Sequence, residues 1–175
     1  MNLLNVFIES ERLKLIPTSE EYAQEIFKEF SDDLTVFMYP KPAKKIGETL
    51  SFINLSRKSM QKGEQLQVVI LNKLTNEFIG HGGISKLNTD TPELGIWIKK
   101  SVHGHKFGRE AVKALKEWID KNKSYKYIIY PVDKRNIPSR KIAESLGGVI
   151  EDEYKKENMS GNILDEVEYR IYPTR

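Results

Sequence analysis

The amino-acid sequence predicts one α/β domain: a mixed, twisted sheet of about seven strands with about four helices on its two faces. Two patterns predict this class. Three short apolar runs in the middle of the chain follow one another closely, as strands of a meander do. The second half then alternates strand and helix, which indicates locally parallel pairing. A length of 175 residues suits one domain, so we expect a single domain over residues 1–175.

The first half is expected to contain one strand, two helices and a loop. Residues 12–15 alternate polar and apolar, Ile16 breaks the alternation, and Pro17 ends this short predicted strand. Residues 18–21 (Thr-Ser-Glu-Glu) resemble a capping box, which would open a helix to about Phe30. Residues 32–42 contain two prolines and are expected to be a loop. A second helix is expected over residues 49–62, because Gly63 follows as a stop signal.

The remaining elements complete the predicted sheet. A helix beginning near Gly108 has its apolar residues on one face, at helical spacing. A short helix is expected from Asn136 to Leu146, because two glycines follow it. The predicted strands are residues 66–71, 77–85, 94–99, 125–132, 149–156 and 163–172, with a turn at residues 160–162 joining the last two.

Composition excludes several classes of function. The 28 Lys and Arg against 25 Asp and Glu give a formal charge of +3, too mild for a nucleic-acid partner to be expected. The chain has no Cys, which excludes disulfides, thiolate nucleophiles and Cys-bound zinc. His103 and His105 lie two apart in a loop, with no carboxylate spaced to join them, so no metal is expected.

No segment predicts an association with a membrane. No apolar run approaches the roughly 20 residues that a membrane helix needs. Residues 1–10 lack the basic start and the apolar stretch of a signal peptide. A cytoplasmic protein is therefore the expectation.

The segment His103-Gly104-His105-Lys106-Phe107-Gly108-Arg109 is the strongest candidate for chemistry, because it connects a strand directly to a helix. A helix start presents amides without intrahelical partners and carries partial positive charge. Glycines allow a close approach, and Lys106 and Arg109 add full charge, so the segment resembles a phosphate cradle. An ordinary strand-to-helix loop is the alternative.

Three stretches together resemble the GNAT acetyltransferase superfamily, in its branch like the ribosomal-protein alanine N-acetyltransferases (RimJ/RimL-like). They are residues 11–15 (Glu-Arg-Leu-Lys-Leu), residues 93–98 (Glu-Leu-Gly-Ile-Trp-Ile) leading into 103–111, and residues 136–148, which open with Asn-Ile-Pro-Ser. The resemblance implies a GNAT-like acyl-CoA N-acyltransferase fold. It implies an enzyme that uses acetyl-CoA as co-substrate and transfers acetyl to a primary amine by direct attack in a ternary complex.

The loop departs from the family pattern at one position. The family reads Gln/Arg-x-x-Gly-x-Gly/Ala, whereas here the first position is His103 and the central glycine is Lys106; Gly108 keeps the pattern. We expect Lys106 to be tolerated with a negative φ and an outward side chain. A positive φ would instead strain the loop by about 1 kcal/mol or more.

The resemblance also assigns the residues that would hold the cofactor. The edge of the fourth family strand would pair with the pantetheine, and an amide near Ile98 would face the thioester oxygen; the alternative is that Ile96, Trp97 and Ile98 are only core. The implied cofactor-binding residues are Trp97, Ile98, Lys99, His103, Gly104, His105, Lys106, Phe107, Gly108, Arg109, Asn136, Ser139 and Lys141.

The proton-transfer groups are assigned in the same way. Ser139 is a candidate to protonate the leaving thiolate, or an inert helix serine. The tyrosine that many superfamily members place four residues further on is Ala143 here. Glu93 is a candidate general base acting through water, or a surface carboxylate. Asn136 would contact the pantetheine amides or cap its helix.

The acceptor is left open between a protein N-terminus and a small amine. Its side of the site would be built by the first two helices, the loop at 32–42 and the final hairpin. Asp32, Asp33 and residues 151–153 would favour a cationic acceptor. A non-catalytic CoA-binding or interaction domain is the alternative function, and either a monomer or a homodimer is expected.

Overall fold

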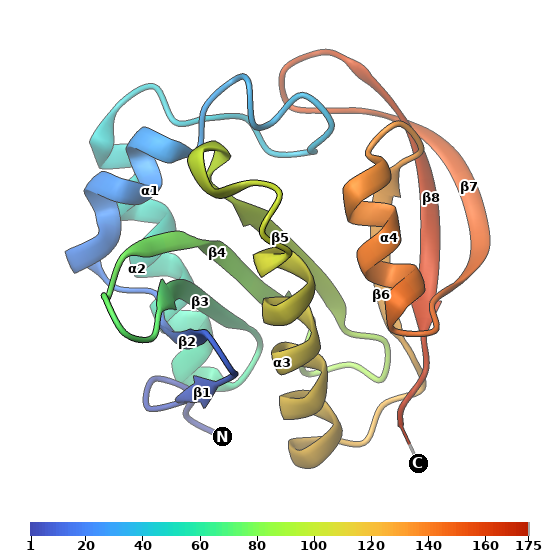
Figure 1. The fold of residues 1–175 in the computed structure, drawn as a ribbon, viewed down its shortest axis with the longest axis horizontal. Coiled ribbons are helices and arrows are strands. Elements are labelled where there is room, and N and C mark those ends of the chain that lie inside the picture. Colours follow the sequence, from blue (N-terminus) through green and yellow to red (C-terminus); the bar gives the residue numbers. More distant parts are fainter. Residues whose placement is uncertain (175) are drawn as a thin grey trace.

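The computed structural model describes residues 1–174, which form one eight-stranded sheet in the order β1-β2-β3-β4-β5-β6-β8-β7 (Figure 1). The strands are β1 (Ile8–Glu9), β2 (Leu13–Pro17), β3 (Leu66–Asn72), β4 (Phe78–Ser85), β5 (Glu93–Ile98), β6 (Ile128–Asp133), β7 (Val149–Glu157) and β8 (Ile163–Ile171). The α-helices are α1 (Ala23–Glu29), α2 (Ile46–Lys62), α3 (Phe107–Asn122) and α4 (Ile137–Ser145). Short 3-10 turns precede α1 (Glu20–Tyr22) and α3 (Lys100–Val102).

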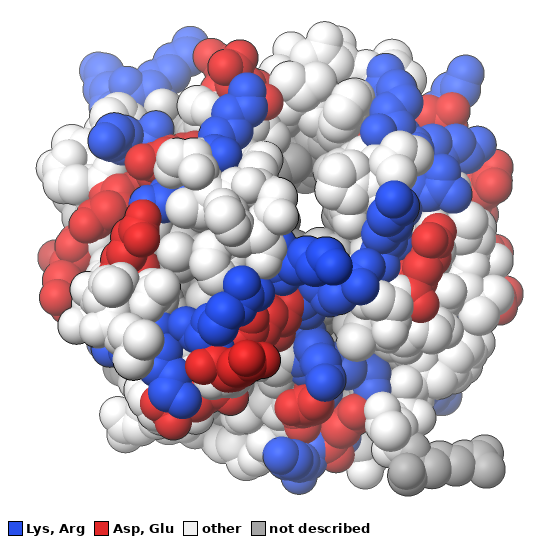
Figure 2. Space-filling model, in the orientation of Figure 1, with Lys and Arg blue, Asp and Glu red and all other residues white. Residues whose placement is uncertain are grey.

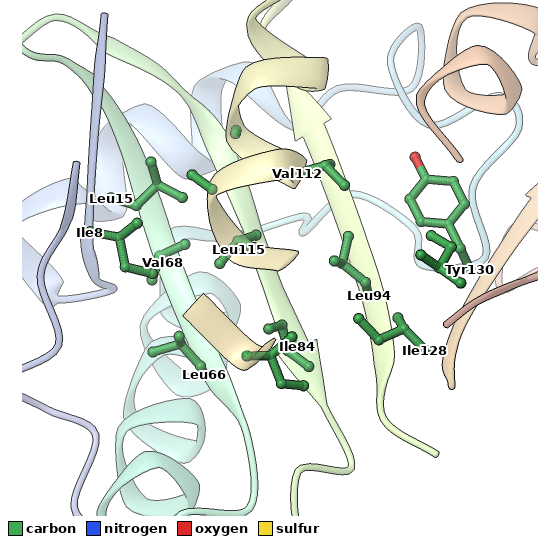
Figure 3. Packing of buried hydrophobic residues seen from close by; sticks show 14 of the residues in the cluster. Ile8, Leu15, Leu66, Val68, Ile84, Leu94, Val112, Leu115, Ile128 and Tyr130 are labelled. Carbon is green, nitrogen blue, oxygen red and sulfur yellow. The ribbon is translucent and has the colours of Figure 1, made fainter. Parts of the chain in front are cut away.

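Helices cover both faces of this sheet. On one face, α3 packs against β1, β2, β4 and β5 while α4 packs against β6; on the other, α1 and α2 cover β3 and β4. The central strand β3 is buried along both faces because its residues are almost all apolar. Figure 3 shows alternate strand residues, among them Leu15, Val68 and Leu94, pointing toward Val112 and Leu115 of α3. The main core therefore lies between α3 and the sheet.

The pairing of β5 with its two neighbours differs sharply. Six residues of β5, from Glu93 to Ile98, pair antiparallel with β4. With β6 the pairing is parallel and has a single position, Glu93 opposite Ile129. The expected parallel pairing in the second half is thus confirmed for β5 and β6. Beyond this position the two strands diverge, and the N-terminal ends of α3 and α4 lie over the gap (Figure 1).

Two expectations for the first half need correction. The strand β1 was not predicted, because two residues are too few to show an alternating pattern. The capping box at residues 18–21 was wrong, since Ser19 makes no side-chain cap and the segment opens as a 3-10 turn. The Thr18 hydroxyl instead lies 2.8 Å from Nε2 of His81, and both residues are buried.

The second helix begins three residues earlier than expected, at Ile46. Glu48 causes this early start, because its Oε2 accepts hydrogen bonds from the amides of Lys44 (2.5 Å) and Lys45 (3.3 Å). These backbone bonds lower the pKa of Glu48. The helix ends at Gly63, whose φ of 76° lies in the left-handed region, as the stop signal predicted.

The expectation for Lys106 was also wrong. Lys106 precedes the first residue of α3 and has a φ of 62°, not a negative one. A side chain in the left-handed region costs roughly 1–2 kcal/mol, which is the strain that a glycine at this position would avoid. The Lys106 side chain is nevertheless exposed, as expected.

This strain leads to a stability prediction for Lys106→Gly. The substitution should raise the free energy of unfolding by up to about 1 kcal/mol, because relief of the left-handed strain exceeds the added freedom of the unfolded chain. Denaturant titration measures the change. Lys113→Gly is the matched control, since Lys113 is exposed inside α3 and its replacement should lower stability by about 1 kcal/mol. Equal destabilisation by both variants would contradict the strain.

Candidate active site

The gap between β5 and β6 exposes one edge of β5. The amide of Lys99, the residue after β5, donates to the carbonyl of Ile79 in β4 at 2.9 Å. Because backbone groups alternate along a strand, the amides of Ile96 and Ile98 point the other way, toward β6. The Ile98 carbonyl accepts a hydrogen bond from Nε2 of His103 at 2.6 Å. The edge therefore offers amide donors beside the loop that leads into α3.

The loop before α3 is held in shape by Arg12 of the segment entering β2. The Arg12 guanidinium donates to the carbonyl of His105 at 3.0 Å and lies 4.5 Å from the centre of the Phe107 ring. Gly104 has a φ of 88°, and a side chain there would meet only open space. The first amides of α3, from Phe107 to Arg109, precede the first intrahelical donor, Glu110, and have no partner within the helix. Such amides attract anions.

The negative charge of Glu110, in the first turn of α3, is balanced by the positive charge of Arg12. Its carboxylate forms an ion pair with Arg12 at 2.7 Å and accepts a hydrogen bond from the Ser10 hydroxyl at 2.6 Å. Burial opposes ionisation, but these hydrogen bonds prevail and lower the pKa of Glu110. The helix start therefore keeps its positive character despite the nearby carboxylate.

Gly108 allows α3 to approach α4 closely. A Cβ at this position would lie 3.0 Å from Cδ1 of Ile142 on α4 and 3.6 Å from Cγ1 of Ile98 on β5. A large side chain would push the two helices apart. The glycine that keeps the family pattern thus serves helix packing at the edge of the gap.

Three exposed cations surround this opening, namely Lys106, Arg109 and Lys141. Figure 2 shows basic side chains gathered beside an opening between the start of α3 and α4. Within residues 1–174, no carboxylate forms an ion pair with any of the three. Lys99 differs, because its Nζ binds Glu77 at 2.8 Å and its side chain is 13% exposed. Lys99 thus points away from the opening.

The start of α4 brings a serine to a buried tyrosine that the sequence did not indicate. Asn136 caps α4, with its Oδ1 accepting from the Ser139 amide at 3.4 Å. The Ser139 hydroxyl lies 2.8 Å from the Tyr130 hydroxyl on β6. Burial raises the pKa of Tyr130 to about 12, although the bond to Ser139 opposes the shift. Tyr130 therefore stays protonated and can donate to Ser139.

Glu93 lies on the opposite face of the sheet from this pair. It begins β5, forms an ion pair with Lys86 at 2.9 Å and faces Ile129 across the single parallel contact. Since successive strand residues alternate faces, Tyr130 points away from Glu93 and toward α4. A carboxylate and a hydroxyl are thus placed on the two sides of the point where the strands separate.

A cavity of about 530 Å³ lies on the Glu93 face. The segments expected on the acceptor side enclose it: α1, α2, the loop after α1 and Met159 of the final hairpin. Its walls are mainly apolar and aromatic and include Phe27, Phe30, Met38, Phe52, Trp97 and Met159. Lined in this way, the cavity suits a small ligand or one end of a larger one.

Two residues of the cavity wall have roles that the sequence did not reveal. The Trp97 ring lies 5.3 Å from Phe30 and 6.1 Å from His81, so its side chain belongs to the cavity. Its backbone pairs with His81 of β4, so Trp97 offers no group to the free edge of β5. Burial lowers the pKa of His81 to about 4, and the ring is neutral at pH 7. An isolated histidine in a strand carries no sequence signal for such a position.

The acidic residues expected beside the acceptor do not line this cavity. Asp32 lines a second cavity of about 370 Å³ next to Arg135. Asp33 pairs with Lys100 at 3.3 Å, and Glu153 pairs with Lys134 at 2.8 Å. These acidic side chains therefore lie outside the wall of the first cavity, and their attraction for a cationic acceptor stays a prediction.

Within residues 1–174, no group of three or more His, Asp or Glu side chains could hold a metal ion. None of the helices in that part of the chain is both long enough and apolar enough to span a membrane.

Comparison with solved structures identifies the same fold. The ribosomal-protein-S5-alanine acetyltransferase from Vibrio fischeri superposes with a TM-score of 0.84 at 19% identity, over 97% of this chain and 97% of that one. RimL, a ribosomal L7/L12 alpha-N-protein acetyltransferase solved in complex with Coenzyme A, gives 0.83 at 17% identity, over 95% and 98%. At these identities the likeness shows a shared fold.

Sequence comparison adds a relative and a family. The uncharacterized protein MJ1062 of Methanocaldococcus jannaschii is 35% identical over 91 residues, which are 50% of this chain but 19% of that protein. The chain thus spans about a fifth of that relative's length. The model of the acetyltransferase (GNAT) domain matches residues 12–149, from the start of β2 to the start of β7. The chain therefore belongs to the GNAT acetyltransferase family.

Proposed function

We propose that this protein transfers the acetyl group of acetyl-CoA to a primary amine within a ternary complex. The observation that carries the proposal is the gap between β5 and β6, bordered by the exposed amides at the start of α3 and by Lys106, Arg109 and Lys141. A split sheet edge beside an anion-binding helix start suits a ligand that is a diphosphate at one end and an amide chain at the other.

The residues divide into two groups for binding the co-substrate. The loop from His103 to Arg109 would receive the diphosphate on its amides, with Lys106 and Arg109 as flanking charges. The β5 edge at Ile96 and Ile98 would pair with the pantetheine amides, and the side-chain amide of Asn136 would contact the same arm. Two observations support binding of the diphosphate at this loop. A Cβ at Gly104 would meet open space, and the hydrogen bond from Arg12 to the His105 carbonyl fixes the loop conformation.

The chemistry follows from the two faces of the gap. The ammonium group of the acceptor first loses a proton, through water, to Glu93 on the cavity face. The amine nitrogen then attacks the thioester carbon, whose oxygen receives a hydrogen bond from the Ile98 amide. As the C–N bond forms and the C–S bond breaks, the nitrogen releases its second proton to water. Ser139 donates a proton to the sulfur on the other face, and solvent then returns a proton to Ser139. Tyr130 stays protonated throughout and orients the Ser139 hydroxyl.

Supporting evidence for the acceptor comes from the relatives. Of the named structural neighbours, one is a ribosomal-protein-S5-alanine acetyltransferase and the other a ribosomal L7/L12 alpha-N-protein acetyltransferase. The acceptor here is proposed to be a primary amine of a protein N-terminus or of a small molecule. A cytoplasmic location, a single domain, and a monomer or homodimer stay predictions, as does the absence of a nucleic-acid or membrane partner.

A thiol-release assay tests this function. Acetyl-CoA with a panel of amines and peptide N-termini should release free CoA thiol in proportion to acetylated product. The alternative, a non-catalytic CoA-binding domain, predicts thermal stabilisation by CoA with no turnover on any acceptor. A protein that neither binds CoA nor turns over would contradict both functions.

The two proposed catalytic residues should give one shared signature. Ser139→Ala and Glu93→Gln should each lower kcat about 10²-fold or more, because each removes a proton-transfer group. The Kd for CoA, from calorimetry, should change little. Ser145→Ala is the matched control, since Ser145 is exposed on the same helix and bonds only the Ile142 carbonyl. Unchanged kcat in Ser139→Ala would remove this serine from the mechanism.

A further inference from the structure

We infer that the acceptor is a primary amine attached to an apolar body of about the size of an aromatic ring. The inference rests on the proposed function and names the substrate class of the same site. It is carried by the lining of the cavity of about 530 Å³ on the Glu93 face, not by the relatives.

The cavity wall is aromatic on several sides. Phe30 and Trp97 lie 5.3 Å apart between ring centres, and Phe52 meets His81 edge-on at 5.7 Å. Phe52 is 44% exposed, although it is a large apolar side chain on α2 that faces this cavity. An aromatic side chain left uncovered inside a concave site gains from an apolar ligand that covers it.

The polar groups around the cavity leave few partners for a charged body. Glu48 lines the mouth, but its carboxylate is committed to the amides at the start of α2. His81 is neutral at pH 7, since burial holds its pKa near 4, and it is hydrogen-bonded to Thr18. Lys41, at the exposed rim, would repel a second cationic group. The cavity therefore discriminates against diamines.

The carboxylates that remain lie at the end where the amine must react. Glu93 lines the cavity at the point where β5 and β6 separate. Glu166 on β8 is a second, buried carboxylate whose pKa is raised by burial and also by Asp133 and Glu93, while Lys156 opposes the shift. A cationic group is therefore favoured at this end of the cavity.

The floor of the cavity has room for the acceptor between Glu93 and Trp97. Gly95 lies between them on the same face of β5, and a Cβ built there would have no atom within 4 Å. The acceptor nitrogen can therefore reach the sheet edge while its apolar body rests against Phe52 and Trp97.

A matched acceptor panel on the full chain tests this inference. The amines are 2-phenylethylamine, ethanolamine and putrescine; two peptides that differ only in their first residue, Phe or Ser, distinguish a protein source from a small molecule. We expect kcat/KM at least about tenfold higher for 2-phenylethylamine or the Phe peptide than for their polar counterparts. The Kd for CoA alone, measured by calorimetry, reports binding of the co-substrate independently of turnover.

Phe52→Ala supplies the structural arm of the test. It should lower kcat/KM for the preferred apolar acceptor by about three- to tenfold, with little effect on ethanolamine or on the Kd for CoA. Leu55→Ala is the matched control, because Leu55 is 64% exposed on α2 and does not line the cavity. Its kcat/KM values should equal those of the unmodified protein.

The outcomes separate the inference from the proposed function. Preference for putrescine, ethanolamine or the Ser peptide would overturn the apolar assignment and leave acetyl transfer intact. Equal effects of Phe52→Ala and Leu55→Ala would show that the acceptor does not bind in this cavity, which also overturns it. CoA binding without turnover of any amine would overturn the proposed function and, with it, the inference.

Discussion

The divergence of β5 from β6 is the constraint on which the site depends. Their single pairing, Glu93 with Ile129, joins the two halves of the sheet and leaves the rest of the β5 edge without a neighbouring strand. An unpaired strand edge is costly if it is buried and invites association if it is exposed. Here α3 and α4 begin on either side of it, so the edge opens into a site that a peptide-like chain can complete (Figure 1).

Tertiary contacts, more than local preference, hold the loop before α3. Lys106 adopts a left-handed conformation that its own side chain disfavours. Arg12 fixes the residues on either side, through the carbonyl of His105 and the ring of Phe107, and Glu110 holds Arg12 in place. The strain is local and small, whereas several bonds connect the loop and α3 to the segment that precedes β2. Backbone strain of this kind is typical of functional sites.

Most of the fold could be predicted from the sequence because its signals are local. The apolar face of α3, the glycine after α2 and the strand-helix alternation each reflect residues close together in the chain. The candidate site was harder to predict. Tyr130 beside Ser139, His81 beside Thr18 and the bracing role of Arg12 depend on contacts between distant segments, which no periodicity reveals. The sign of φ at Lys106 was also missed, since lysine carries no signal for the left-handed region.

A crystal structure with CoA bound tests the central claim most directly. The account predicts the diphosphate against the amides of Phe107, Gly108 and Arg109, and the pantetheine along the β5 edge at Ile96 and Ile98. The thioester oxygen should then lie beside the Ile98 amide, with the acetyl group facing the aromatic cavity. CoA bound elsewhere, or a loop closed over those amides by the side chain of Lys106, would contradict the account.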